Sequence, residues 1–242
     1  MINLIGGEIY RLLHKKSMYI YFASLAAAYI LLAFIRSGGF RPESVLTDAV
    51  SAFGLLPAIA GGFLFSAIYT DDLNSKNLIS LVGFGISKVK IVVAKFALMA
   101  LFGTVIFGIA PLFHCAAYAL FGQIATMDAV MTISAISLKY LLVTVAFSAL
   151  AGIVVYGFQR TTFAIVMYLL LAFNIISSLL TIGLNMIDPM LRNHLISGIT
   201  DRIMTGIMSG SSSALSIMEY IIYVLIAATL TAAVFYKKEM EF

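Results

Sequence analysis

The chain has 242 residues, of which 62 % are hydrophobic and only 11 % are charged, and its formal net charge is +4. A soluble globular domain carries roughly 45–50 % apolar and about 25 % charged residues, so this chain has too few charges to cover its apolar surface in water. The composition excludes a soluble enzyme, a secreted domain and a disordered regulator, and it predicts an all-α integral membrane protein. The single cysteine, Cys115, excludes an internal disulfide and a multi-cysteine metal site.

The first 16 residues are too short to cross a bilayer, but their Ile and Leu side chains share one face of a helix. Glu8, Arg11 and Lys15 fall elsewhere around that helix, and Lys16 adds to its basic end. This amphipathic pattern predicts an interfacial helix over residues 1–16, with its basic end toward anionic lipid. A plain cytosolic extension of the first span is the alternative.

Six stretches are apolar and long enough to cross a bilayer, for which about 20 residues are needed. Lys95, Lys139 and Glu219 lie close enough to the ends of these stretches to extend their charges to the interface. No carboxylate falls in the middle of a stretch, which disfavours a proton-coupled secondary transporter. The six stretches are 18–35, 49–70, about 91 to beyond 112, about 138–158, 161–187 and about 220–236.

The basic residues orient this six-span bundle, because cytoplasmic loops carry the excess of Lys and Arg. With both termini placed in the cytoplasm, ten of the 15 basic residues fall on the inner side. The sequence therefore predicts a multi-pass protein of the cell membrane with both termini cytoplasmic. The five on the outer side are Arg36, Arg41, Lys139, Arg192 and Arg202.

The segment after the second span, residues 71–90, is the most informative in the chain. Asp71 or Asp72 can cap a helix, and Asn74, Leu78 and Leu81 share one helical face. We expect a short amphipathic helix over residues 71–82, held at the cytoplasmic surface by two spans. An ordinary solvated loop is the alternative. The loop between spans four and five is very short and offers little for a partner to contact.

Two further patterns concern the spans and the outer side. Asn174, Ser178, Thr181 and Asn185 form a polar stripe on span five, either as the wall of a translocation path or as hydrogen bonds between packed helices. Small residues at four-residue spacing in span two favour close packing, and Pro57 favours a bend. Between spans five and six, residues 188–213 carry Ile or Leu every four residues, which predicts outer amphipathic helices rather than a soluble loop.

Chemistry-bearing motifs are absent from the sequence. There is no nucleotide-binding loop, no zinc-protease or serine-hydrolase motif and no CxxC pair. The three histidines are too dispersed to suggest a metal site. We therefore expect no catalytic residues and no cofactor or metal bound by this chain.

Three stretches resemble the permease subunits of type-two ABC exporters, and the six-span layout extends the resemblance over the whole length. In that family a basic elbow helix precedes span one, an acidic and then leucine-containing helix follows span two, and the tail is basic. The matching stretches here are Glu8-Ile9-Tyr10-Arg11-Leu12 with Lys15-Lys16, Asp71-Asp72 through Leu78 to Lys88 and Lys95, and Tyr236-Lys237-Lys238-Glu239.

The resemblance implies a single transmembrane domain over residues 1–242, with an elbow helix, a coupling helix at 71–82 and re-entrant helices at 188–213. It implies two partner ABC ATPase subunits, which would bind the ATP and Mg²⁺, and a second permease copy or paralogue. The small size resembles exporters of amphipathic peptides such as bacteriocins and phenol-soluble modulins. Hydrophobic cargo and the lipid bilayer are the other expected partners, and nucleic acid is not one.

Two other functions remain open at this point. A secondary transporter or channel would need a mid-span charge or matching repeats with broken helices, and neither is found. A membrane scaffold without transport activity is harder to separate from a permease by sequence.

Overall fold

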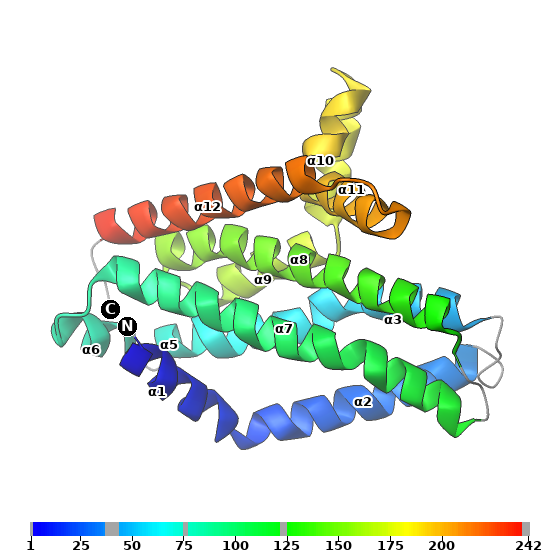
Figure 1. Cartoon of the computed structure of the whole chain (residues 1–242). Coiled ribbons are helices and arrows are strands. Elements are labelled where there is room, and N and C mark those ends of the chain that lie inside the picture. Colours follow the sequence, from blue (N-terminus) through cyan, green and yellow to red (C-terminus); the bar gives the residue numbers. More distant parts are fainter. Residues whose placement is uncertain (1, 37–43, 75–76, 122–124, 239–242) are drawn as a thin grey trace.

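The computed structural model describes residues 2–36, 44–74, 77–121 and 125–238, and in this part every regular element is a helix. Figure 1 shows the long helices side by side as a bundle, with the start of α1 and the end of α12 at one end. The elements are α1 (Ile2–Leu13), α2 (Lys16–Arg36), α3 (Val45–Leu56), η2 (Pro57–Gly61), α4 (Gly62–Phe65), η3 (Ser66–Thr70), α5 (Asp71–Asn74), α6 (Asn77–Gly83), α7 (Lys88–Leu120), α8 (Met127–Phe158), α9 (Thr161–Ala172), α10 (Ile175–Asn185), η4 (Pro189–His194), α11 (Ile196–Ser209) and α12 (Ala214–Lys237).

Four of the described helices are long and apolar enough to cross a membrane: Val45–Thr70, Lys88–Leu120, Met127–Phe158 and Ala214–Lys237. The bent pair α9 and α10 makes a fifth if it is counted as one span. The all-helical character predicted from composition is therefore confirmed for the described residues, and these four or five candidate spans suggest a multi-pass membrane protein. The predicted first span lies in α2, some of whose side chains fall outside the described residues, so a count of six spans stays a prediction.

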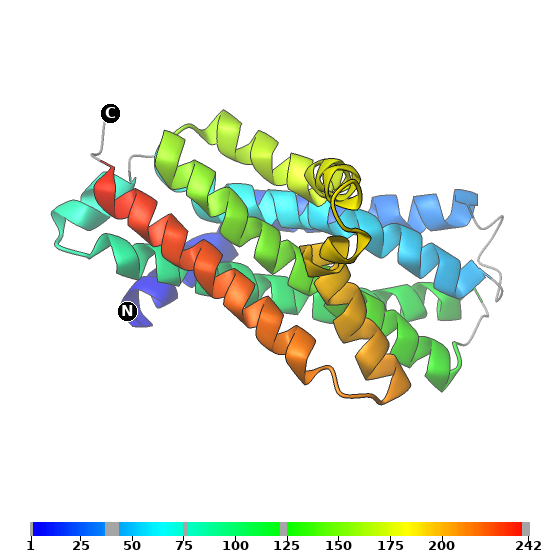
Figure 2. The same ribbon diagram turned by 90° about the horizontal axis from the view of Figure 1, so that it is seen from above.

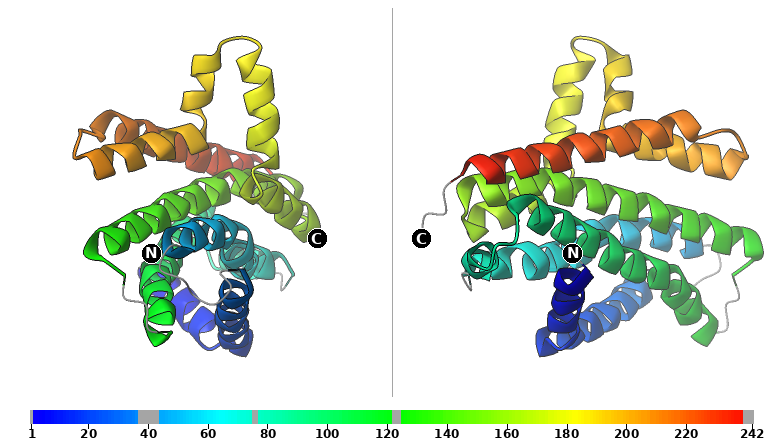
Figure 3. Two further views of the ribbon diagram at one scale, coloured as in Figure 1. Left: turned by 90° about the vertical axis from the view of Figure 1, so that its right-hand side faces the viewer. Right: turned by 60° about the vertical axis from the view of Figure 1, so that its left-hand side comes forward.

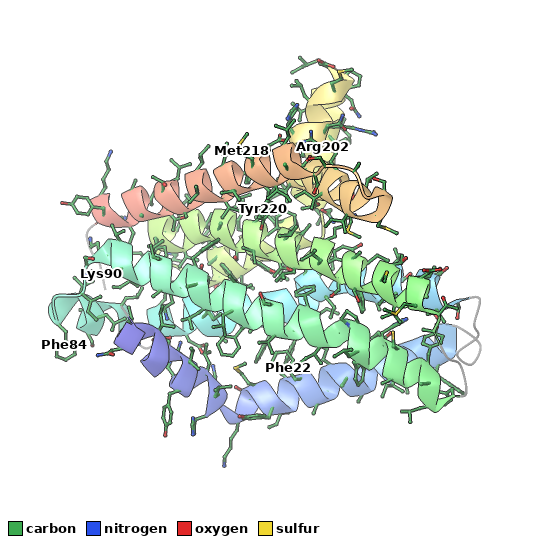
Figure 4. All side chains as sticks on the ribbon, in the orientation of Figure 1. Phe22, Phe84, Lys90, Arg202, Met218 and Tyr220 are labelled. Atoms are coloured by element: carbon green, nitrogen blue, oxygen red, sulfur yellow. The ribbon has the colours of Figure 1, made fainter. Side chains whose placement is uncertain are left out.

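Helix α8 is the centre of the bundle and packs against α3, α7, α9, α11 and α12. Small residues allow α12 to approach it closely: a Cβ added to Gly152 would lie 3.3 Å from the Thr231 methyl. Thr231 Oγ1 also donates to the Ala149 carbonyl at 3.2 Å. Tyr220, which points from α12 toward α8 in Figure 4, donates to the Leu142 carbonyl at 2.9 Å. The hydrophobic effect does not drive helices together within a lipid bilayer. Close packing and hydrogen bonds of this kind hold the helices together instead.

The second span is widened rather than simply bent at Pro57. It continues from α3 to α5 through two π-helical turns, η2 and η3, separated by one turn of α-helix. The Tyr168 hydroxyl donates to the Pro57 carbonyl at 2.8 Å, in the first of these wide turns. Gly61 lies directly under that hydroxyl, and an added Cβ would overlap it. The small residues of this span thus serve close packing, as expected.

The fifth span is broken where the sequence predicts one continuous helix over residues 161–187. Helices α9 and α10 meet at 58°, and Asn174 between them has φ 57°. Asparagine is one of the few residues that adopt this left-handed conformation readily, so it can break the helix. Figure 3 shows α10 projecting from the bundle, and none of its residues is buried.

The segment at 188–213, which the sequence predicts on the outer side, returns from this projection to the bundle. It forms η4 and α11, and α11 packs against α8 and α12 with Ile199 and Ile203 buried. Figure 2 shows α11 and α12 lying over the rest of the bundle. The four-residue spacing of Ile and Leu thus marks a face that packs on other helices, while Ile207 is half-exposed.

Gly61→Ala should destabilise the protein by about 1–3 kcal/mol, because the new methyl group overlaps the Tyr168 hydroxyl. Thermal unfolding in detergent measures this effect. Gly108→Ala on α7 is the matched control, since nothing lies within 4 Å of an added Cβ there. Adding Tyr168→Phe to Gly61→Ala should recover part of the loss, and an unchanged melting temperature for Gly61→Ala alone would contradict the assigned contact.

Candidate functional site: an ion-pair network at the end that holds α1 and α6

A buried ion pair connects the first helix to the third long helix. Glu8 on α1 and Lys95 on α7 are 6 % and 2 % exposed, and Lys95 Nζ lies 2.8 Å from Glu8 Oε2. Helix α1 places Glu8 there because Leu12, one turn further along, is fully buried and Ile5 and Ile9 pack against the same core. The sequence analysis predicts that Lys95 extends its charge to the membrane interface. The structure instead buries Lys95, because α1 packs over it and Glu8 supplies a carboxylate.

Arg11 and Lys15 extend this pair into a network that reaches the end of the second span. Arg11 Nη2 lies 2.7 Å from Glu8 Oε2, and it also donates to the Ala67 carbonyl at 3.3 Å. Arg11 Nη1 lies 3.7 Å from Asp71 Oδ2, and the Lys15 ammonium contacts the same oxygen. One set of charges thus ties α1 to α7 and to the start of α5.

The network affects the acidity of Glu8. Burial by itself would raise the pKa of this carboxyl, but the Lys95 ammonium and the Arg11 guanidinium favour the ionised form more strongly. The pKa of Glu8 is therefore lowered from its ordinary value of 4.5. The carboxylate stays charged at neutral pH although it is buried.

The residues predicted for the coupling segment divide between this network and the core. Asp71 belongs to the network, Leu78 is 2 % exposed, and Leu81 is partly buried against the same core as α1. The predicted helix over 71–82 contains two helices, α5 and α6, and residues 75–76 lie outside the described part. The side chains of Asp72 and Asn74 also lie outside it, so the structure does not place them.

Of the four predicted elbow residues, Glu8, Arg11 and Lys15 meet in the network, while Lys16 is exposed at the start of α2. Of the four polar residues predicted on span five, three lie on α10 and one lies at its start. Asn174 sits at the break, Ser178 and Asn185 are exposed on α10, and Thr181 donates to the Ser177 carbonyl at 2.7 Å.

Several features of this end of the bundle escaped the sequence analysis. Phe84 is 84 % exposed in the turn between α6 and α7, and Figure 4 places it at the extremity of the molecule. Lys88 joins α7 to α12 by donating to the Lys238 carbonyl at 2.8 Å. The short loop between α8 and α9, expected to offer little, lines a pocket of about 320 Å³ with Leu73 of α5. In the sequence, the glycines on both sides of Phe84 indicate a turn, from which the Phe84 side chain can project.

In the described part of the chain, no three His, Cys, Asp or Glu side chains gather closely enough to hold an ion. The network carries carboxylates that are already bonded to cations, so it is suited to joining helices rather than to binding a ligand. Comparison with known proteins assigns no family: no family model matches the sequence, and no curated protein matches it.

Glu8→Gln should destabilise the protein by about 3–5 kcal/mol, because it removes the negative charge that the buried Lys95 ammonium contacts. Lys95→Met should cost less, since Glu8 keeps Arg11. The double variant Glu8→Gln/Lys95→Met should recover most of the loss, because neither charge remains buried. Denaturant unfolding in mixed micelles gives the coupling free energy of this cycle, and strictly additive effects would show that the two residues do not pair.

Acid should weaken the wild-type protein more than Glu8→Gln. A carboxyl whose pKa is lowered by folding contributes stability above its unfolded value and loses it as the pH falls through the lowered value. The melting temperature of the wild type should therefore fall more steeply than that of Glu8→Gln below about pH 4.5, the ordinary value. Parallel curves for the two proteins would contradict the pairing.

Proposed function

We propose that this chain is the permease subunit of a type-two ABC exporter. In this proposal α2 is the first of six spans, and both termini are cytoplasmic. The observation that carries the proposal is the ion-pair network, which joins the N-terminal helix, the segment after the second span and α7. Those are the parts that the resemblance assigns to the elbow, the coupling helix and the lysine early in span three.

The network gives a physical route for a force applied to α5 and α6. Asp71 is bonded to Arg11 and Lys15 of the elbow segment, and Glu8 of that segment is bonded to Lys95. A partner that displaces α5 pulls on the elbow segment through the partly exposed Asp71 pairs, and the elbow segment pulls on α7 through the Glu8–Lys95 pair, which is buried and therefore costly to separate. In the proposal, two ATPase subunits bind ATP and Mg²⁺ and supply that displacement on closing.

The contact surface for the ATPase is the end of the bundle that holds α6. Phe84 and the half-exposed Ile79 project there, next to the exposed Lys90. The pocket between Leu73 and the loop at Gln159 and Arg160 opens on the cytoplasmic side of the proposed topology. This combination suits a protein partner that provides apolar contacts and carboxylates.

The proposed cargo is amphipathic or hydrophobic, with peptides as the favoured class, moving outward. Helix α10 carries exposed Leu179 and Ile182 together with the polar Ser178 and Asn185. Exposed amide and hydroxyl groups on a helix within lipid are stabilised when another helix supplies hydrogen bonds. We place the second permease copy, or a paralogue, against α10, so that a mildly polar path forms between the two.

Asp71→Lys should uncouple transport from ATP hydrolysis. The variant replaces attraction to Arg11 and Lys15 by repulsion, so ATPase closure no longer moves α1. The test uses proteoliposomes that contain the permease and an ATPase encoded beside it. ATP hydrolysis should persist, while uptake of a fluorescent amphipathic peptide should fall at least tenfold. A tenfold fall corresponds to a loss of about 1.4 kcal/mol of coupling free energy. Lys15→Asp in the same chain should restore part of the transport.

Asp201→Lys is the matched control, because Asp201 forms an ion pair with Lys139 at 2.5 Å, on the α11 side of the bundle. It should leave the coupling ratio unchanged. Unaffected transport in Asp71→Lys would show that the coupling segment is misplaced. Robust ATP hydrolysis by the purified chain without a partner would contradict the permease assignment itself.

A further inference from the structure

The pocket of about 320 Å³ lies where one candidate span ends and the next begins. Helix α8 ends at Phe158 and α9 begins at Thr161, so a loop of two residues joins them. The lining consists of Leu73 of α5 with Gln159, Arg160, Thr161, Thr162 and Phe163. Figure 2 shows this junction at the end of the bundle that also holds α6 and the end of α12. A junction this short between two spans lies at the depth of the lipid headgroups.

Three side chains of the lining have no hydrogen-bond or ion-pair partner in the part of the chain that the structure describes: Arg160, Thr161 and Thr162. Threonines inside the helices instead donate to a carbonyl one turn back, as Thr229 donates to the Leu225 carbonyl at 2.7 Å. Arg160 is exposed, and no other residue that lines the pocket is charged. The pocket therefore offers free donors and one positive charge, and no carboxylate in its lining competes for them.

A phosphate group matches these donors. The planar guanidinium of arginine forms two parallel N–H bonds to phosphate oxygens, and such charged hydrogen bonds are stronger than neutral ones. Threonine hydroxyls can donate to the same oxygens. The volume of about 320 Å³ is near the lower end of the range for ligand pockets, roughly 300–1,000 Å³, so it suits a headgroup rather than a whole lipid.

Exposed aromatic rings border the pocket and decide between a lipid and a soluble anion. Phe163 lines the pocket, and its ring stacks on that of Phe158 with centroids 5.7 Å apart. Both rings are exposed, and so is Val166, nearly one turn further along α9. Exposed apolar surface of this kind marks contact with a membrane or a partner. Acyl chains cover it, whereas inorganic phosphate or a single carboxylate does not, so a phosphate that carries acyl chains fits the site best.

We propose that this pocket binds the phosphate of an anionic phospholipid. The Arg160 guanidinium donates to two phosphate oxygens, and the hydroxyls of Thr161 and Thr162 donate to the same group. The acyl chains lie along the rings of Phe158 and Phe163. Binding forms and breaks no covalent bond.

The lipid site does not depend on the proposed ATPase, although both use the same end of the bundle. In the proposed topology this end contacts the cytoplasmic leaflet, whose negative surface potential attracts basic side chains. A headgroup in the pocket neutralises Arg160 and leaves Phe84 and Ile79 as contacts for a partner protein. Lipid binding is therefore testable on this chain alone.

Native mass spectrometry of the full chain in detergent micelles measures the dissociation constant of the first phosphatidylglycerol molecule bound. Arg160→Gln removes the charge, so this constant should rise about tenfold or more, the factor lost with a charged hydrogen bond. Thr161→Val/Thr162→Val keeps the shape of both side chains and removes both hydroxyls, so the constant should rise about fivefold. Lys90→Gln is the matched control, because Lys90 is exposed at the same end of the bundle and loses the same charge. It should leave the constant nearly unchanged.

Two further ligands separate an anionic lipid from other phosphates. Phosphatidylcholine, which carries a phosphate but no net charge, should bind more weakly, and inorganic phosphate should not displace phosphatidylglycerol. Thermal unfolding without lipid shows whether the variants fold, and the threonine variant keeps the test decisive if Arg160→Gln does not.

Three results would overturn the proposal: a constant unchanged in Arg160→Gln, a constant raised equally in Lys90→Gln, or equal binding of phosphatidylcholine. Displacement by inorganic phosphate would also overturn it, because the pocket would then be a site for a soluble anion. Unchanged lipid binding in Arg160→Gln, together with lost co-purification of an ATPase, would assign the pocket to a carboxylate of that partner instead.

Discussion

The architecture depends on one ammonium group. Lys95 is 2 % exposed within a helix that is otherwise apolar, and an unmatched charge there would cost several kcal/mol. Glu8 matches it, so α1 must fold back over α7 instead of extending away from the bundle. Once α1 is in that position, Arg11 and Lys15 are brought to Asp71. The position of the segment after the second span therefore follows from the need to neutralise Lys95.

Two polar clusters share the same helix. Lys95 and His114 are 19 residues apart on α7, which is roughly 28 Å along an α-helix. One cluster fixes α1 and α5 to this helix, and the other, in which His114 bonds to Tyr29 and to the Val45 carbonyl, fixes α2 and the start of α3. Helix α2 is bonded to α7 through Tyr29, while the segment that precedes α2 is bonded to α7 through Glu8. The part of the second span that lies between the two clusters contains both π-helical turns. This helix is therefore irregular between the two points at which it joins the clusters.

Much of this fold is readable from the sequence, because composition and run length are direct physical signals. The apolar runs predict the long helices, and the N-terminal amphipathic pattern predicts α1. The residues of the network were also singled out, Lys95 included, but not the pairing of Lys95 with Glu8, which lies 87 positions away in sequence. No local pattern indicates that Glu8 and Lys95 meet, since that contact depends on how α1 packs.

Local chemistry accounts for the other differences. The break at Asn174 depends on one residue adopting a left-handed conformation, which asparagine permits but does not require. The first π-helical turn receives a hydrogen bond from the Tyr168 hydroxyl, which comes from a different span. Asp48 lies just outside the apolar run and is buried by contacts with α7, so hydropathy alone treats it as a surface residue. In each case the decisive interaction is tertiary.

The most direct test of the account is whether the buried Glu8–Lys95 pair fixes the position of α1 relative to the neighbouring α6. Pulsed electron paramagnetic resonance can measure the distance between spin labels at Tyr10 and Ile79, both exposed, in a Cys115→Ser background in lipid nanodiscs. The account predicts a single narrow distance distribution that broadens when Glu8→Gln is added. An equally narrow distribution in the Glu8→Gln protein would contradict it, because the elbow would then be positioned without the charge that Lys95 requires.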